Sequence, residues 1–287
     1  MSVPSFAAFI LTNGRPDNVI TYATLRRSGY TGPIYLIVDD LDETIDAYRE
    51  NYPDEVIVFD KRAIAQTFDQ SHNFQDMRSP IYARNASWAI ARDLGLDHFV
   101  QLDDDYTRFS WRFNSRFDYQ HVELTQLDSV FAAMVAFSDG CGAAAVALAQ
   151  GGDYLGGPKS TSNPFVQAPT LIRKCMNSFV CATARPFTFV GCANDDVTTY
   201  THKGSTGLLF FTLTAASLNQ IQTQMGDGGM TELYKEYGTY VKSFYSVLYQ
   251  PSSVHVCPLQ SRFARLHHRV TWRHTVPKIL SETWRKS

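Results

Sequence analysis

Short apolar runs alternate with longer segments of helical character over the first half of the chain. Apolar runs bounded by turn residues are typical of buried strands, whereas apolar positions that recur every three or four residues indicate helices. The predicted strands are 6–11, 34–38, 56–59 and 98–102, and the predicted helices are 18–28, 41–51 and 80–94. This alternation predicts an α/β fold, in which a mostly parallel sheet carries helices on both faces.

The second half has a less regular pattern. The predicted helices are 124–137 and 230–237, and the predicted strands are 142–149, 187–190, 208–213 and 241–248. A glycine-rich stretch at 151–157 lacks the spacing of a phosphate-binding or dinucleotide-binding loop, so we assign it no such role.

Three consecutive carboxylates, Asp103, Asp104 and Asp105, follow the apolar run 98–102 directly. The carboxyl end of a strand in an open α/β sheet is where ligands bind. Three like charges are costly there unless a cation lies between them, and Mg²⁺ takes one or two carboxylates together with phosphate oxygens. The triplet therefore indicates a divalent cation that carries a diphosphate. A solvated acidic turn is the alternative interpretation.

Composition narrows the class of protein. Hydrophobic residues make up 44% of the 287 and charged residues 19%, which indicates a globular protein rather than a disordered one. The five cysteines show no C-x-x-C spacing, so neither a zinc site nor a disulfide framework is expected. We find no membrane-spanning stretch and no signal peptide, and we expect a cytoplasmic protein.

The charge is unevenly distributed. Residues 262–287 contain seven Lys or Arg and one acid, which gives this tail a formal charge of +6 and the rest of the chain −8. A basic tail with Trp272 and Trp284 suggests contact with a polyanion, which its arginines, together with Arg173 and Lys174, would bind. The alternative is that these arginines pair with the acids of the chain itself and that the tryptophans pack.

Several segments carry a resemblance to a known family. The segments are 35–40, 56–61, 82–86, 102–106, 149–153, 176–179, 194–197, 238–245 and 267–269. With the Thr-Asn-Gly-Arg turn at 12–15, they resemble a glycosyltransferase of the GT-A type, and within it the TET-associated glycosyltransferases of bacteriophages. That family is proposed to add sugars to hydroxymethylated bases in phage DNA. If a phage encodes this chain, the expected location is the host cytoplasm.

The resemblance implies a fold and an activity. The fold is a GT-A, Rossmann-like sheet flanked by helices, with residues 1–110 as the nucleotide-sugar-binding half and 111–261 as the acceptor half. The tail 262–287 would be an acceptor-binding extension that packs on the active site or contacts DNA. The activity is transfer of a sugar from a nucleotide sugar, with a UDP-sugar favoured, to 5-hydroxymethylcytosine in DNA.

The metal ion implied by the resemblance is Mn²⁺ or Mg²⁺. Asp105 is the expected direct ligand, and Asp103 would bind the ribose or a metal-bound water. Asp104 is assigned to the nucleotide site, although strand alternation would turn it to the other face. His268 follows His267 where GT-A enzymes often bring a histidine to the metal, but the two histidines could equally contact phosphate.

The nucleotide site is predicted from four segments that follow or begin secondary structure. Its residues are Thr12, Asn13, Arg15, Asp39, Asp40, Arg84, Asn85, Asp103 and Asp104. The turn at 12–15 offers backbone amides, and Arg15 would reach a phosphate. Arg84 and Asn85 lie near a helix N-terminus, which favours an anion. The alternatives are an ordinary surface turn, an exposed acidic strand end and an exposed helix residue.

A general base is needed if the transfer inverts the configuration of the sugar. Asp196 is the predicted base and Asp195 its support, because a carboxylate pair is frequent at this place in GT-A enzymes. The family tends to have Glu before this Asp, and this chain has Asp195 instead. A helix N-cap carboxylate is the alternative. A glycan or protein acceptor, and a non-catalytic protein that binds nucleotide or DNA, are the competing functions.

Overall fold

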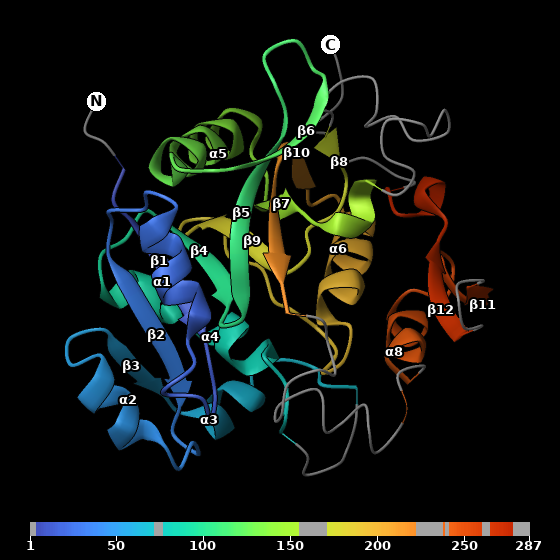
Figure 1. Ribbon diagram of the computed structural model, residues 1–287. Coiled ribbons are helices and arrows are strands. Elements are labelled where there is room, and N and C mark those ends of the chain that lie inside the picture. Colours follow the sequence, from blue (N-terminus) through green and yellow to red (C-terminus); the bar gives the residue numbers. More distant parts are fainter. Residues whose placement is uncertain are drawn as a thin grey trace.

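The computed structural model describes residues 4–71, 77–154, 171–221, 238, 241–259 and 265–277. In this part of the chain the main sheet has ten strands in the order β3-β2-β1-β4-β9-β7-β10-β5-β6, and β8 pairs with β10 (Figure 1). The strands are β1 (Phe6–Leu11), β2 (Ile34–Asp39), β3 (Val56–Phe59), β4 (His98–Asp103), β5 (Tyr106–Phe113), β6 (Tyr119–Glu123), β7 (Ala145–Ala149), β8 (Leu171–Ile172), β9 (Ser178–Ala182) and β10 (Phe210–Gln220).

The helices alternate with the strands in the first half. They are α1 (Ile20–Arg27), α2 (Ile45–Asn51), α3 (Lys61–Ala65), α4 (Ile81–Asp93), α5 (Leu127–Cys141), α6 (Asp195–Ser205) and α8 (Val241–Tyr249), with 3-10 turns η1 (Gly151–Tyr154) and η4 (Trp272–His274). A separate two-stranded sheet pairs β11 (Val254–Leu259) with β12 (Arg265–Val270). No helix in the described ranges is long and apolar enough to cross a membrane.

Strands β1 to β4 form a parallel block. β1 pairs in parallel with both β2 and β4, and β2 pairs in parallel with β3. The register places Leu11, the last residue of β1, opposite Asp103, the last residue of β4. The residues that follow these strands therefore meet at one edge of the sheet. The other part is mixed: β7 and β10 are parallel, whereas β9 runs antiparallel to β4 and β7.

Both faces of the sheet are buried, and β1 shows how. Ala8 and Ile10 belong to a core with residues of α1 and α5, whereas Ala7 and Phe9 belong to a second core with residues of α4 and α6. A strand buried on both faces has a continuous apolar sequence rather than an alternating one. The predicted α/β sheet with helices on both faces is thereby confirmed.

Most predicted elements of the parallel block are confirmed, but two in the second half are wrong. Residues 187–190 form no strand: Phe187 and Phe189 pack into the core beside α4, and the side chain of Asn85 binds the Phe189 backbone. Residues 241–248 form helix α8, whose small buried residues Ser243 and Ser246 allow it to lie close to its neighbours. The predicted helix at 230–237 lies outside the described residues.

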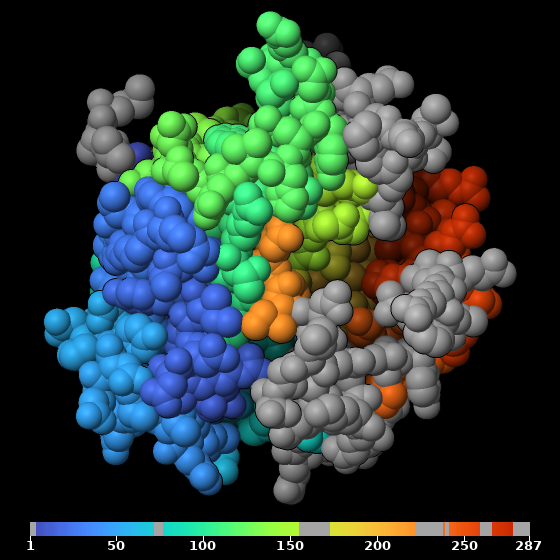
Figure 2. All heavy atoms as spheres, viewed as in Figure 1, coloured from blue at the N-terminus to red at the C-terminus, as the bar shows by residue number. Residues whose placement is uncertain are grey.

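The predicted boundaries do not coincide with breaks in the structure. The division between residues 110 and 111 falls inside β5, which continues in the β5–β6 hairpin that projects from the molecule in Figure 2. The division between 261 and 262 falls between β11 and β12, which pair with each other. Helix α8 contacts both β11 and β12, and these three elements with η4 are called the C-terminal unit below. Its helix α8 packs on α6, and Trp272 of η4 stacks on Tyr200 with ring centroids 5.8 Å apart.

Candidate active site

The three aspartates of the triplet have three different environments. Asp103 ends β4 and accepts from Nη2 of Arg84 at 3.2 Å. Asp104 is buried on another side, where it accepts from Oγ1 of Thr12 at 2.8 Å and from Nη1 of Arg15 at 3.1 Å. Oδ1 of Asp105 is buried without a hydrogen-bond partner. Asp104 and Asp105 form the turn between β4 and β5, and this turn separates Asp104 from its neighbours.

Burial raises the pKa of all three carboxyl groups. It raises the pKa of Asp105 to about 7, and the charges of Asp103 and Asp104 add to this effect. It raises the pKa of Asp103 to about 6, although Arg84 opposes the shift. The pKa of Asp104 is raised by burial against the opposing charge of Arg15. The negative charge at this strand end is therefore only partly compensated by the protein.

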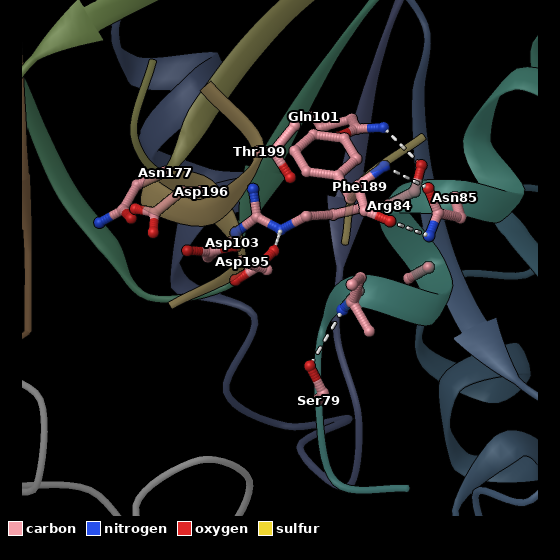
Figure 3. Close-up of polar contacts among 12 residues, drawn as sticks. Ser79, Arg84, Asn85, Gln101, Asp103, Asn177, Phe189, Asp195, Asp196 and Thr199 are labelled. Carbon is pink, nitrogen blue, oxygen red and sulfur yellow. Dashed lines mark hydrogen bonds and ion pairs between the residues drawn. The ribbon is translucent and has the colours of Figure 1, made fainter. Parts of the chain in front are cut away.

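Arg84 connects the triplet to the second half of the chain (Figure 3). This buried side chain extends from α4 and places Nε 3.0 Å from Oδ2 of Asp195, while Nη2 contacts Asp103. Its guanidinium carbon lies 4.8 Å from the ring centroid of Phe179 and 5.6 Å from that of Phe189. The interpretation of Arg84 as an exposed helix residue is wrong. Both of its ion pairs are with carboxylates, which leaves its predicted contact with the nucleotide untested.

Asp195 and Asp196 are buried in the first turn of α6. The N-cap position belongs to Asn194, so the N-cap interpretation of Asp196 is wrong. Asp195 is engaged by Arg84, and Oδ1 of Asp196 accepts from the backbone N–H of Val197 at 2.7 Å. Burial raises the pKa of Asp195 to about 6 and also raises the pKa of Asp196. A carboxylate with a raised pKa is suited to accept a proton.

The predicted nucleotide-site residues of β1 and β2 meet at the carboxyl edge of the sheet. Asn13 donates to Asp39 at 3.0 Å, and Lys61 forms a buried ion pair with the same carboxylate at 3.0 Å. Asp40 is exposed and accepts from the backbone N–H of Lys61. Sequence reasoning missed Lys61, although it lies two residues after the end of β3, at the start of α3, and so at the same edge.

Tyr48 is a second residue of this edge that sequence reasoning missed. Its hydroxyl lies 2.7 Å from Oγ1 of Thr12 and accepts from the backbone N–H of Arg15 at 2.8 Å. Tyr48 is fully buried on α2, where an apolar position of the helix was the only available signal. It fixes the turn that precedes α1.

Asn85 has a different environment from its neighbours at the site. Its side-chain amide donates to the carbonyl of Phe189 at 3.1 Å and accepts from the N–H of the same residue at 2.8 Å. These two hydrogen bonds satisfy the backbone of Phe189, which in a strand at 187–190 would bond to the backbone of a neighbouring strand. The amide thereby holds Phe189 against Arg84, and a contact with nucleotide stays a prediction.

His268 lies on β12, and its Nδ1 is 3.3 Å from Nδ2 of Asn194. Burial, together with the nearby groups His267, Lys242 and Lys174, lowers the pKa of His268 to about 3. Among the described residues, no group of three or more His, Cys, Asp or Glu side chains is placed to hold a metal ion. The structure therefore does not gather His268 with Asp103 and Asp105 into one cluster.

The basic residues assigned to DNA are partly engaged by the protein. Lys174 forms an ion pair with Asp153, and Arg173 donates to Thr275. Trp272 packs on Tyr200, so packing accounts for one face of its ring. Five further residues of the predicted interface lie outside the described ranges, namely Arg262, Lys278, Trp284, Arg285 and Lys286.

The geometry defines an α/β protein with an acidic cluster, the candidate ligand site, at the carboxyl edge of the sheet. A family model for TET-associated glycosyltransferases matches residues 6–229. The chain belongs to this family, which confirms the resemblance seen in the sequence. No curated protein matches the chain.

Solved structures of several glycosyltransferases are similar over most of the chain. One is glucosyl-3-phosphoglycerate synthase from Mycobacterium tuberculosis with Mg²⁺ and UDP: TM-score 0.45, 8% identity, 93% of this chain and 88% of that chain covered. The same enzyme with Mn²⁺ and UDP-glucose has a TM-score of 0.44 and 9% identity, with 93% of this chain and 87% of that chain covered. A mannosyltransferase from Pyrobaculum calidifontis with GDP-mannose and Mn²⁺ has a TM-score of 0.44 and 11% identity, with 88% of this chain and 75% of that chain covered.

Proposed function

We propose that this protein transfers a sugar from a nucleotide sugar, with a UDP-sugar favoured, to 5-hydroxymethylcytosine in DNA. The observation that carries the proposal is membership of the TET-associated glycosyltransferase family over residues 6–229. The partly compensated carboxylates at the end of β4 support the need for a cationic donor complex. The basic tail supports a polyanionic acceptor over a glycan or a protein.

The residues at the end of β4 fit a hard divalent cation. Oδ1 of Asp105 is buried and unpartnered, and Asp103 ends the same strand. Mg²⁺ and Mn²⁺ accept one or two carboxylates together with phosphate oxygens, so a cluster of three protein ligands is unnecessary. In the proposal Asp105 and Asp103 hold Mn²⁺ or Mg²⁺. When bound, the ion would neutralise the charge that develops on the leaving diphosphate.

The nucleotide would lie along the carboxyl ends of β1 and β2. The turn of Thr12, Asn13 and Arg15 offers polar groups there, and the exposed Asp40 borders the same edge. Asp39, already paired with Lys61, shapes this part of the site. Arg84 acts indirectly in this proposal, because it holds Asp103 and Asp195 in a fixed relation.

Asp196 is the proposed general base for a transfer with inversion. The hydroxymethyl oxygen of the acceptor attacks C1 of the sugar, and the bond from C1 to the diphosphate oxygen breaks. The nucleoside diphosphate leaves with the electron pair of that bond, and the hydroxyl proton moves to a carboxylate oxygen of Asp196. Asp195, held by Arg84, keeps the first turn of α6 in place.

A donor and acceptor panel tests the proposal. The full chain is incubated with hydroxymethylated DNA, unmodified DNA and a glycan acceptor, each with a set of UDP-sugars and GDP-mannose and with Mn²⁺ or Mg²⁺. Mass spectrometry of the digested nucleosides is expected to show one hexose added to hydroxymethylcytosine. Transfer to unmodified DNA, or to the glycan alone, would overturn the acceptor assignment. Absence of both transfer and donor hydrolysis with every donor would overturn the enzymatic function.

A further inference from the structure

The first turn of α6 is fastened from outside by the C-terminal unit. Asn194, which precedes the two aspartates, has a left-handed backbone with φ of 57°, and its side chain makes no cap bond to the helix. A left-handed conformation is uncommon for any residue other than glycine, although Asn adopts it more readily than most. Nδ2 of Asn194 instead donates to Oγ of Ser246 at 2.7 Å and approaches Nδ1 of His268 at 3.3 Å.

Ser246 closes a ring of hydrogen bonds around the start of α6. It is fully buried on α8, and its Oγ lies 3.0 Å from Oγ1 of Thr198. Oγ1 of Thr198 in turn donates to the carbonyl of Asn194 at 2.9 Å. Fully satisfied buried networks of this kind fix one arrangement of the side chains and backbone that they join. Asp195, Asp196 and Val197 lie between Asn194 and Thr198, the two residues of α6 and its N-cap that this ring joins.

The contact with Asn194 also determines the state of His268. A neutral imidazole has one nitrogen with a lone pair and one that carries hydrogen. Because Nδ1 accepts from Asn194, Nε2 carries the hydrogen and has no lone pair for a metal ion. Burial of His268, with Lys242 and Lys174 nearby, keeps the ring neutral, which is consistent with this tautomer.

We infer that Asn194, Ser246 and His268 are positioning residues that hold Asp195 and Asp196 for the reaction, and that His268 acts through Nδ1 rather than as a metal ligand. The part that concerns catalysis rests on the proposed function of Asp196. The part that concerns the bonds around α6 does not, because it describes the protein without donor or acceptor.

Two isosteric replacements of His268 separate the two roles. In His268→Asn the side-chain oxygen occupies the place of Nδ1 and can accept from Asn194, whereas Nε2 is lost. In His268→Gln the amide reaches the place of Nε2, and the acceptor at Nδ1 is lost. We expect His268→Asn to keep kcat and Mn²⁺ affinity, and His268→Gln to lower kcat roughly 10- to 100-fold, as a displacement near 1 Å can do. The KM for the donor is expected to stay the same in both variants.

The opposite ranking would overturn the inference. If His268 binds the metal through Nε2, His268→Asn raises the Kd for Mn²⁺ in the nucleotide-bound protein, measured by calorimetry, and His268→Gln restores it. If both variants behave as wild type in kcat and Kd, His268 has no positioning role.

Asn194→Gly and Ser246→Ala test the ring without touching the histidine. Glycine tolerates the left-handed backbone, so the first variant removes only the side-chain contacts. Ser205→Ala is the matched control, because its Oγ caps a carbonyl at the far end of α6. Amide exchange at 195–199 in the metal-free, substrate-free protein is expected to accelerate in both test variants and not in the control. Unchanged exchange overturns the ring, whereas full transfer by Asp196→Asn overturns only the proposed base.

Discussion

Two acidic strand ends lie on the same edge of the sheet and differ in how their charges are balanced. At the end of β2, Asp39 has an ion pair with Lys61 and accepts from Asn13 and from the backbone N–H of Leu41. At the end of β4, Asp105 has a buried oxygen without a partner. A buried carboxylate with a full set of partners is stabilised by the protein itself. A buried carboxylate without partners is stabilised when a ligand brings positive charge to it. The second strand end is therefore the place to seek the donor complex.

The largest expected effect is a loss of sugar transfer on substitution of Asp105, at the end of β4. Asp105→Asn removes the carboxylate that would hold the metal ion, so transfer is expected to fall at least about 100-fold, since metal stabilisation of developing charge is worth several kcal/mol. Asp104→Asn is the control, because Asp104 is engaged by Thr12 and Arg15. Initial rates of transfer and Mn²⁺ titrations are measured for both variants. A larger loss of Mn²⁺ affinity in Asp104→Asn would reverse the assignment of these two residues.

The second prediction concerns the cation that balances Asp103. Arg84→Met leaves Asp103 and Asp195 buried without their shared partner, and we expect the free energy of unfolding to fall by about 3–5 kcal/mol. Urea denaturation gives this difference. Arg92→Met changes an exposed arginine of the same helix and is expected to cost less than about 1 kcal/mol. A similar effect of the two substitutions would mean that the contacts of Arg84 contribute little.

At the end of β2, where the charge of Asp39 is balanced, removal of the cation should lower stability less than Arg84→Met does. Lys61→Met removes the ion pair of Asp39 but leaves its bonds from Asn13 and Leu41, so we expect a loss of about 2 kcal/mol in stability. Arg62→Met, at the neighbouring exposed position of α3, serves as the control for urea denaturation. Loss of transfer as large as that of Asp105→Asn, in a folded Lys61→Met protein, would show that this end also carries chemistry.

The smallest expected effect is a dependence of stability on pH, caused by His268, which is buried as a neutral imidazole. The folded pKa of His268 is lowered to about 3 from 6.5, so the unfolded chain binds a proton that the folded chain does not. Its contribution is fully present above pH 6.5 and is lost as the pH falls toward 3. In His268→Asn this loss is absent, and the variant should gain about 1 kcal/mol relative to wild type near pH 5.5. Urea denaturation of both proteins at pH 5.5 and above pH 6.5 measures this difference. Identical dependence of stability on pH in the two proteins would contradict the prediction.

The sequence predicted the parallel block well because its local signals agree with its environment. The strand at 56–59 is found with the predicted bounds, and that at 6–11 likewise, since both are apolar runs between turns. The helix expected from residue 41 begins at Ile45 instead. Asp42 accepts from the backbone N–H and the hydroxyl of Thr44, and such local side-chain bonds compete with helix formation.

The second half was less predictable because distant contacts decide its structure. The segment 241–248 was predicted as a strand, yet it is a helix that places Ser246 against Thr198 of α6. Its apolar residues Val241, Phe244, Tyr245 and Leu248 recur at helical spacing, a signal that the prediction missed. The partners of the candidate site were equally hidden. The sequence located the acidic pairs, but not that Arg84 joins them, because that contact spans 111 residues between Arg84 and Asp195. Strand ends can be found from local pattern, whereas partners across the sheet cannot.

The place of β9 between β4 and β7 has a consequence for synthesis of the chain. Residue Arg84 and the end of β4 leave the ribosome well before Phe179, Phe189 and Asp195, which enclose the arginine in the finished protein. Pairings between strands so far apart in sequence are slow to form. The growing chain therefore carries an open acidic edge and an uncovered strand β4 until the second half has emerged, and a truncated chain that ends before β9 should aggregate rather than bind the donor.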